Sequence, residues 1–276
     1  MTIDPTLADQ RTSYDQLIHR DLPAGVTTRT TTLGGRPALE IRTGATGGTL
    51  LFLHGGGYRL GSPAAYAGFT TAIARQTGTE AVAPDYRLAP EHPFPAATDD
   101  ALAAYRELVR NVHPSRLVIG GDSAGGGLTI ATLVGARDAG LPLPAAAFVF
   151  SPYADLTHSG ESMRTRVGID PIFTPEALAT LGALYTSDPH DPRASVWTAD
   201  LRGLPPLLIQ VGSSELLLDD AVRLAARAAA DDVDVTLEVT ARAPHVFQNR
   251  FGDGGPADAA LENVGRFVRR HLTVRR

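Results

Sequence analysis

Short apolar segments alternate with longer amphipathic ones along most of this chain, and this alternation predicts its secondary structure. Apolar or β-branched runs typical of strands lie at 49–53, 80–83, 116–120, 145–150, 206–211 and 233–239. Helical spacing of apolar residues lies at 4–20, 63–77, 96–110, 127–134, 215–230 and 256–271. Strands separated by helices favour a parallel sheet with helices on both faces. The pattern therefore predicts an α/β protein with a mostly parallel sheet.

Two segments depart from this alternation. Residues 26–33 and 37–42 are threonine-rich or alternating and are separated by Gly34 and Gly35, which predicts a β-hairpin at an antiparallel edge of the sheet. Residues 151–200 are rich in Pro, Ser, Thr and Asp, and the segment is too long for a plain loop in a compact domain. It is expected to be a lid or a mobile insertion. Its two short helical candidates lie near 159–166 and 175–184.

The composition narrows the class of protein. With 276 residues and 43% hydrophobic residues, the chain can form one large domain, or one domain with a lid, around a buried core. The net charge of −5 has no acidic or basic block, so no nucleic-acid partner is expected, and the arginines at 269–270 and 275–276 are expected to be a solvated helix end. The absence of cysteine excludes disulfides and thiolate chemistry. The first residues lack the features of a signal peptide, and no apolar stretch reaches the ~18 residues of a membrane span. We expect a soluble, cytoplasmic protein with no membrane partner.

The residues Gly-Asp-Ser-Ala-Gly-Gly at 121–126 carry the strongest chemical signal. They lie between a predicted strand and a predicted helix, and a serine among small residues at such a turn matches the nucleophile elbow, Gly-x-Ser-x-Gly. The turn is expected to lift the Ser123 hydroxyl out of the sheet. It also directs the N–H of Ala124, at a helix start, toward developing negative charge. The alternative is a glycine-rich turn with a solvated serine, and the other candidate residues make that alternative less favourable.

A serine hydroxyl needs a general base, and His245 is the candidate. It lies in a proline-flanked loop after the last predicted strand, whereas His92 and His113 lie in or beside a proline-rich region and His271 on the terminal helix. A lone loop histidine is more often a surface residue. The order nucleophile, acid, base along this chain matches the order in hydrolases that carry the elbow, which favours catalysis.

The base in turn needs a carboxylate that fixes its tautomer and stabilises the imidazolium. Glu215 is the first acid after the strand at 206–211, four residues beyond Val211. Asp219 and Asp220 fall inside the following predicted helix and are expected to be solvated or paired. Glu215 is therefore the preferred acid, and Asp219 is the alternative.

A second glycine-rich segment, His-Gly-Gly-Gly at 54–57, follows the predicted strand at 49–53. Consecutive glycines let backbone N–H groups approach a substrate, and together with Ala124 they can form an oxyanion hole in which one donor is worth ~3 kcal/mol of barrier. The segment lacks the Lys and Ser/Thr of a Walker loop, the chain lacks a Gly-x-Gly-x-x-Gly register, and scattered histidines without cysteine argue against a metal site. All candidate segments follow strands, where ligands bind in such sheets.

A proline-rich region holds a polar cluster of Asp85, Tyr86, Arg87, Glu91 and His92. A second catalytic site is one interpretation. The preferred interpretation is a half-buried network that braces the glycine loop at 54–57.

These motifs together resemble the hormone-sensitive-lipase family of α/β-hydrolases. The resemblance rests on the segments at 54–57, 84–97 and 121–126, with Ser-Pro-Tyr-Ala-Asp-Leu at 151–156 beside them, and it covers about residues 35–270 in matching order. It implies the α/β-hydrolase fold as a single domain at 1–276, with an eight-stranded sheet and a helical lid from about 1–25 and 155–200.

The resemblance also implies site residues and an activity. The oxyanion donors would be the N–H groups of Gly56, Gly57 and Ala124. The family often has Asp-Pro-Leu in the acid turn, whereas this chain has Glu-Leu-Leu at 215–217, as in the subset that uses glutamate. The implied activity is that of a serine carboxylesterase acting on short-chain acyl esters or small lactones, without cofactor or metal. Related proteins suggest a homodimer through the last strand and helix.

The expected reaction is attack of Ser123 on an ester carbonyl while His245 takes its proton, followed by hydrolysis of the acyl-enzyme. Candidate substrate-binding residues, each of which could equally belong to the core, are Tyr58, Tyr153, Met163, Phe173, Leu184 and Phe247. One alternative is a non-catalytic small-molecule-binding protein on the same fold, which the presence of His245 disfavours. Another is an amidase or acyltransferase that uses the same triad.

Overall fold

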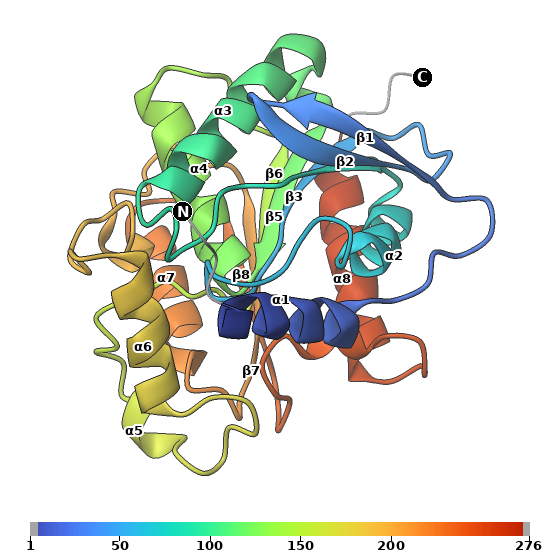
Figure 1. Cartoon of the computed structure of the whole chain (residues 1–276). Coiled ribbons are helices and arrows are strands. Elements are labelled where there is room, and N and C mark those ends of the chain that lie inside the picture. Colours follow the sequence, from blue (N-terminus) through green and yellow to red (C-terminus); the bar gives the residue numbers. More distant parts are fainter. Residues whose placement is uncertain (1–4, 273–276) are drawn as a thin grey trace.

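A single sheet organises the computed structural model, which describes residues 5–272 (Figure 1). In that range eight strands follow the order β1-β2-β4-β3-β5-β6-β7-β8. They are β1 (Thr27–Leu33), β2 (Arg36–Arg42), β3 (Thr49–Leu53), β4 (Glu80–Pro84), β5 (Leu117–Asp122), β6 (Ala146–Phe150), β7 (Leu207–Gly212) and β8 (Val235–Thr240). β2 pairs antiparallel with β1 and β4, and the other pairs are parallel. The expected eight-stranded, mostly parallel sheet with an antiparallel hairpin at its edge is confirmed.

The helices fall close to the predicted ranges. They are α1 (Pro5–Ile18), α2 (Ala67–Thr77), α3 (Ala96–Asn111), α4 (Ala124–Asp138), α5 (Ser162–Thr165), α6 (Pro175–Tyr185), α7 (Leu218–Ala230) and α8 (Pro256–His271), with short 3-10 turns η1 (Pro114–Arg116), η2 (Val196–Thr198) and η3 (Phe247–Arg250). The helix expected from residue 63 begins only at Ala67, because Ser62 accepts the N–H groups of Ala65 and Tyr66 and closes turns before it. Residue 4 of the first predicted helix and the basic residues at 275–276 lie outside the described residues.

Helices cover both faces of the sheet, and the central strands divide their side chains between them. Leu50 and Phe52 of β3 belong to the core cluster that contains residues of α2 and α8. Leu51 and Leu53 of the same strand belong to the cluster that contains residues of α3, α4 and α7. Successive strand residues point to opposite faces, so a continuous apolar run is buried on both sides. Within residues 5–272, no helix has the length and apolar character needed to cross a membrane.

The helices α1, α5 and α6 lie in the lower half of the view in Figure 1. An ion pair of 2.7 Å between Arg11 and Glu91 ties α1 to the proline-rich region. In the same region, the Tyr86 hydroxyl donates to the His54 carbonyl oxygen at 2.6 Å. The polar cluster expected there is therefore a structural network, as predicted, and it braces both the glycine loop and the N-terminal helix.

Candidate active site

Ser123 occupies a strained turn between β5, which ends at Asp122, and α4, which begins at Ala124. Its φ of 53° and ψ of −119° lie outside the regions that side-chain-bearing residues ordinarily adopt. The conformation is held by Ser123 N, which donates to the Phe150 carbonyl at 2.8 Å, and by Tyr153 N, which donates to the Ser123 carbonyl at 2.9 Å. A Cβ at Gly125 would overlap the Leu53 carbonyl, so this approach requires glycine.

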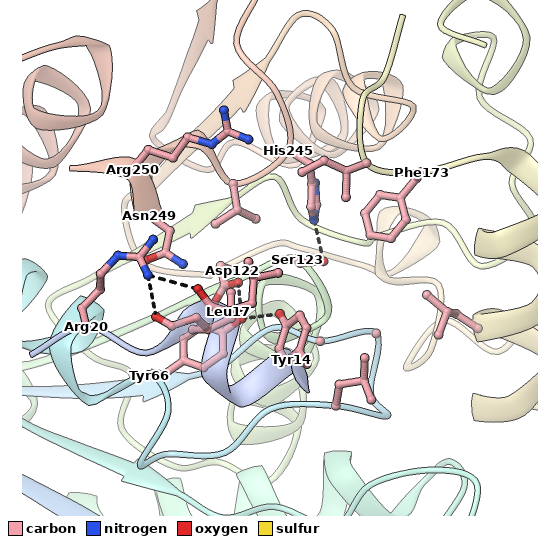
Figure 2. Close-up of a pocket in the computed structure, with 17 residues that line it drawn as sticks. Tyr14, Leu17, Arg20, Tyr66, Asp122, Ser123, Phe173, His245, Asn249 and Arg250 are labelled. Carbon is pink, nitrogen blue, oxygen red and sulfur yellow. Dashed lines mark hydrogen bonds between the residues drawn. The ribbon is translucent and has the colours of Figure 1, made fainter. Parts of the chain in front are cut away.

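His245 lies between Ser123 and Glu215, in the loop after β8. Its Nε2 is 2.9 Å from Ser123 Oγ, and its Nδ1 is 2.8 Å from Glu215 Oε2 (Figure 2 shows the first contact). A carboxylate can only accept, so Nδ1 carries the proton and Nε2 is left to accept from the serine hydroxyl. Ser123, His245 and Glu215 are 6%, 8% and 0% exposed. The three side chains predicted to act together are therefore joined in one buried hydrogen-bonded chain.

The carboxylate of Glu215 is held from several sides. Its Oε1 accepts from Ser151 Oγ at 2.7 Å and from Gly212 N at 2.5 Å. Ser151 Oγ also accepts from Val246 N at 3.1 Å, which fixes the loop beside His245. Because every oxygen has a donor, the buried carboxylate keeps one orientation. Sequence reasoning did not single out Ser151, although its position directly after β6, between β5 and β7, places it at the same sheet edge.

The alternative acid does not reach the histidine. Asp219 Oδ2 accepts from Ser162 N, and Asp220 Oδ2 accepts from the N–H groups of Ala154 and Asp155, each at 2.8 Å. Both carboxylates therefore anchor the segment that follows β6.

The glycine loop lies beside Ser123. Gly56 has φ 110°, a value that favours glycine, and a Cβ there would overlap the Leu60 carbonyl. Within the described part of the chain, no protein acceptor takes the N–H of Gly56 or Gly57. Ala124 is the first residue of α4, so its N–H has no partner within the helix. These backbone donors are free to bind an oxyanion formed at Ser123.

Asp122 links this loop to the N-terminal helix, and sequence reasoning missed it. Its Oδ1 accepts from Gly55 N at 2.9 Å and its Oδ2 from the Tyr66 hydroxyl at 3.2 Å, and the Tyr66 hydroxyl lies 2.8 Å from the hydroxyl of Tyr14 in α1. Burial raises the pKa of Asp122 to about 7, against the opposing effects of His245 and of the Gly55 and Tyr66 hydrogen bonds. Its position next to Ser123 was the one signal in the sequence that could have indicated it.

A cavity of about 240 Å³ opens above Ser123 and His245 (Figure 2). Its lining residues are Tyr14, Leu17, Ile18, Arg20, Gly56, Gly57, Leu60, Tyr66, Asp122, Ser123, Ile172, Phe173, Leu181, His245, Val246, Asn249 and Arg250. The walls thus combine the sheet edge with α1, α6 and the segment before α6. Among residues 5–272, no group of three or more His, Cys, Asp or Glu side chains could hold a metal ion.

Of the side chains expected to line the cavity, the structure places Phe173 on its wall, with its ring centroid 5.0 Å from that of His245. Five others lie off the wall: Tyr58, Tyr153, Met163, Leu184 and Phe247. Tyr58 stacks on Tyr185 at 3.7 Å between ring centroids, and Tyr153 contacts His158. Phe247 follows His245 closely but is buried against α8. A ring near a site residue in sequence can lie on either side of the backbone, and here the rings of Tyr58, Tyr153 and Phe247 are buried in the core.

Comparisons with known proteins agree with this geometry. A family model described as the alpha/beta hydrolase fold matches residues 50–249. The "Acetyl-hydrolase" of Streptomyces hygroscopicus is 44% identical over 226 residues, which cover 81% of this chain and 76% of that protein. The "Esterase" of Acinetobacter venetianus is 36% identical over 241 residues, which cover 86% and 80%.

Solved structures agree over nearly the whole chain. The crystal structure of an esterase from the bacterial hormone-sensitive lipase family has a TM-score of 0.94 and 42% identity, and covers 99% of this chain and 94% of that one. The crystal structure of EstE5 soaked with p-nitrophenyl butyrate has a TM-score of 0.92 and 40% identity, and covers 98% and 94%.

Proposed function

The chain belongs to the hormone-sensitive-lipase family of α/β-hydrolase-fold carboxylic ester hydrolases, and we propose that it hydrolyses short-chain acyl esters or small lactones through an acyl-enzyme on Ser123. The observation that carries this proposal is the buried chain from Ser123 Oγ to His245 Nε2 at 2.9 Å and from His245 Nδ1 to Glu215 at 2.8 Å. No cofactor is needed for this chemistry.

In the proposed mechanism, Ser123 Oγ attacks the ester carbonyl while His245 Nε2 takes its proton. Glu215 stabilises the imidazolium that forms. The N–H groups of Gly56, Gly57 and Ala124 donate to the oxyanion of the tetrahedral intermediate. The proton on Nε2 then passes to the leaving alcohol, and water activated by the same histidine releases the acid from Ser123.

The preference for small substrates is supported by the cavity. Its volume of about 240 Å³ is below the ~300–1,000 Å³ of pockets for drug-sized ligands. The EstE5 crystal named above was soaked with p-nitrophenyl butyrate, a four-carbon acyl ester. A short acyl chain or a small lactone ring matches this space, with Phe173 as the proposed substrate-binding side chain that lines it.

A lid is part of the same proposal, within one domain that spans the chain. It comprises about residues 1–25 and 155–200, of which residues 1–4 lie outside the described residues. Its support is that Tyr14 and Leu17 of α1 and Leu181 of α6 all line the cavity. Closure of these segments over bound ester would exclude water from the acyl pocket.

A homodimer through the sheet edge is a further part of the proposal. β8 is one of the two edge strands of the sheet, and Val239 on it is 47% exposed. The outer edge of such a strand can pair with the same edge in a second copy. Sedimentation at several protein concentrations tests this, since a monomer throughout would remove the dimer from the proposal.

Hydrolysis of p-nitrophenyl esters from C2 to C12, with a small lactone beside them, tests the proposed function. The unsubstituted protein and Ser123→Ala are compared, with melting curves showing that both are folded. Turnover that peaks at short chains and vanishes in the variant is expected. A protein that binds a small acyl ligand but turns over none of these esters would contradict the proposal and indicate a binding protein instead.

A further inference from the structure

One end of the cavity is polar, and its residues have no part in the proposed mechanism. Arg20 follows α1, and Asn249 and Arg250 belong to η3. Figure 2 shows these three side chains on one side of Ser123 and His245, with Phe173 on the other. The cavity therefore has an apolar end and a polar end, with the reacting hydroxyl between them.

Asn249 is the buried member of the polar end. It is 8% exposed, and within residues 5–272 its Oδ1 has no hydrogen-bond partner. A buried amide oxygen without a partner is uncommon and costs free energy, because its lost contacts with water are not replaced. Its amide can turn to present either the oxygen or the NH2 group, so it can donate as well as accept. A polar group of a bound substrate would satisfy it.

Arg20 and Arg250 give this end its charge. Neither forms an ion pair with a carboxylate in the described part of the chain, in contrast to Arg11, which binds Glu91. Arg20 Nη1 donates to the carbonyl oxygens of Leu17 at 3.0 Å and His19 at 2.8 Å, which hold the guanidinium at the end of α1. Arg250 is exposed, and no side-chain partner is found for it among the described residues.

One carboxyl group also lines the cavity, and it does not neutralise the polar end. Asp122 is buried below Ser123, and its two oxygens already accept from Gly55 N and the Tyr66 hydroxyl. Both guanidinium groups are left without an opposite charge beside an unsatisfied amide. Guanidinium groups bind carboxylates through paired N–H donors, and such charge-assisted hydrogen bonds are among the strongest in proteins.

We propose that Arg20, Asn249 and Arg250 form a carboxylate-binding subsite, so that the preferred substrates are esters whose acyl or alcohol part bears a carboxylate. This inference rests on the proposed ester hydrolysis and adds a substrate class to it. The apolar end takes the uncharged part of the ester, while the subsite holds the carboxylate and orients the reacting carbonyl over Ser123.

Two matched pairs of esters test the subsite. Mono-p-nitrophenyl glutarate is compared with its methyl ester for the acyl side, and 4-acetoxybenzoate with methyl 4-acetoxybenzoate for the alcohol side, after subtraction of uncatalysed rates. In at least one pair, kcat/KM is expected to favour the charged ester at low salt, and this preference is expected to fall as ionic strength rises.

Substitutions locate the effect. In Arg20→Gln and Arg250→Gln, the charged-to-neutral ratio of kcat/KM is expected to fall about 10-fold, as for loss of a charge-assisted hydrogen bond. Arg242→Gln is the matched control, because it removes the same charge from an exposed residue that does not line this cavity, and its ratio should equal that of the unsubstituted protein. A charged-to-neutral ratio at or below unity in both pairs would overturn the inference, as would an equal fall in Arg242→Gln.

A binding measurement separates the subsite from the chemistry. Calorimetry of Ser123→Ala with glutarate and with dimethyl glutarate does not depend on turnover. If glutarate binds more tightly than dimethyl glutarate, and this preference is lost in Arg250→Gln on the same background, the subsite is supported. This holds even if no ester is hydrolysed, because the absence of hydrolysis would contradict only the proposed function. Equal or weaker binding of glutarate overturns the subsite while leaving ester hydrolysis untouched.

Discussion

The cavity has two walls that are built in different ways. The sheet wall includes Ser123 and His245. These two residues, together with Glu215, which does not line the cavity, are at most 8% exposed and are joined by hydrogen bonds. The cap wall, formed by α1, α6 and the segment before α6, is more exposed: Leu17 is 69% exposed and Ile172 is 48% exposed. Buried, fully hydrogen-bonded groups keep one geometry, whereas a partly exposed apolar surface can shift at low cost. This difference supports the proposal that residues of the sheet wall carry out the reaction, while the cap wall influences which substrates bind.

The largest difference in kcat is expected between variants of two acids four residues apart, of which only Glu215 contacts His245 of the sheet wall. Glu215→Gln should lower kcat by about 10³–10⁴-fold, because the amide favours the wrong tautomer of His245. Asp219→Asn should change kcat by less than about threefold, because Asp219 binds Ser162 N and does not contact the histidine. Initial rates on p-nitrophenyl butyrate measure both. A larger loss in Asp219→Asn would reverse the assignment of the acid.

Asp122 lies where the sheet wall and the cap wall meet, and its substitution is expected to have the next largest effect on kcat. Asp122→Ala leaves the buried Gly55 N–H without its acceptor, so the glycine loop at 54–57, which carries the proposed oxyanion donors, loses its anchor next to Gly56. We expect kcat to fall by about 10–100-fold with little change in KM, as for a partly disordered oxyanion hole. Tyr66→Phe, which removes only the second hydrogen bond to Asp122, should have a smaller effect. A rise in KM with kcat unchanged in Asp122→Ala would instead indicate a role in substrate binding.

The pH dependence of stability tests the burial of this carboxyl group. Its pKa is raised from 3.8 to about 7, so between these values the folded protein keeps a proton that the unfolded chain has lost. Stability therefore falls as pH rises through this window, by up to about 1.4 kcal/mol per pH unit. Asp122→Asn keeps the hydrogen-bonding shape and removes the titration. The unfolding free energy of Asp122→Asn minus that of the unsubstituted protein should therefore increase from about pH 4 to pH 7. A difference that stays constant over this range would contradict the raised pKa.

The smallest effect is expected on the cap wall, and it should alter substrate choice. Phe173→Ala enlarges the cavity beside His245, so kcat/KM should shift toward longer acyl chains by about 5–10-fold between p-nitrophenyl butyrate and octanoate, as for a change of a few methylene groups in a pocket. Val167→Ala is the control, because Val167 is 57% exposed and does not line the cavity. The same shift in both variants would assign it to the mobility of the segment rather than to the wall.

The difference between the sheet wall and the cap wall also explains which parts of the site could be predicted from the sequence. Ser123 and Gly56 lie in short motifs directly after strands, and a parallel sheet brings such ends together, so local patterns were enough. His245 and Glu215 were found by the same rule and by their order along the chain. The central sheet followed from apolar runs that alternate with helices.

The residues of the cap wall could not be predicted by such a rule. Leu17 and Tyr14 come from a helix more than a hundred residues before Ser123, and only tertiary packing brings them over the cavity. Tyr58 and Phe247 are near site residues in sequence, yet their rings enter the core, because the local backbone and not the spacing decides the side. The polar end with Asn249 and Arg250 carries no motif at all. Substrate-contacting surfaces of this kind depend on long-range contacts that single-sequence patterns do not encode.

Covalent labelling with diethyl p-nitrophenyl phosphate tests the central claim most directly. If Ser123 is the nucleophile activated by His245 and Glu215, one equivalent of p-nitrophenolate should be released per active chain, ester hydrolysis should stop, and peptide mass analysis should find the diethylphosphoryl group on Ser123. The Ser123→Ala protein should take up no label. A label on another residue, or ester hydrolysis that continues after stoichiometric labelling of Ser123, would contradict the account.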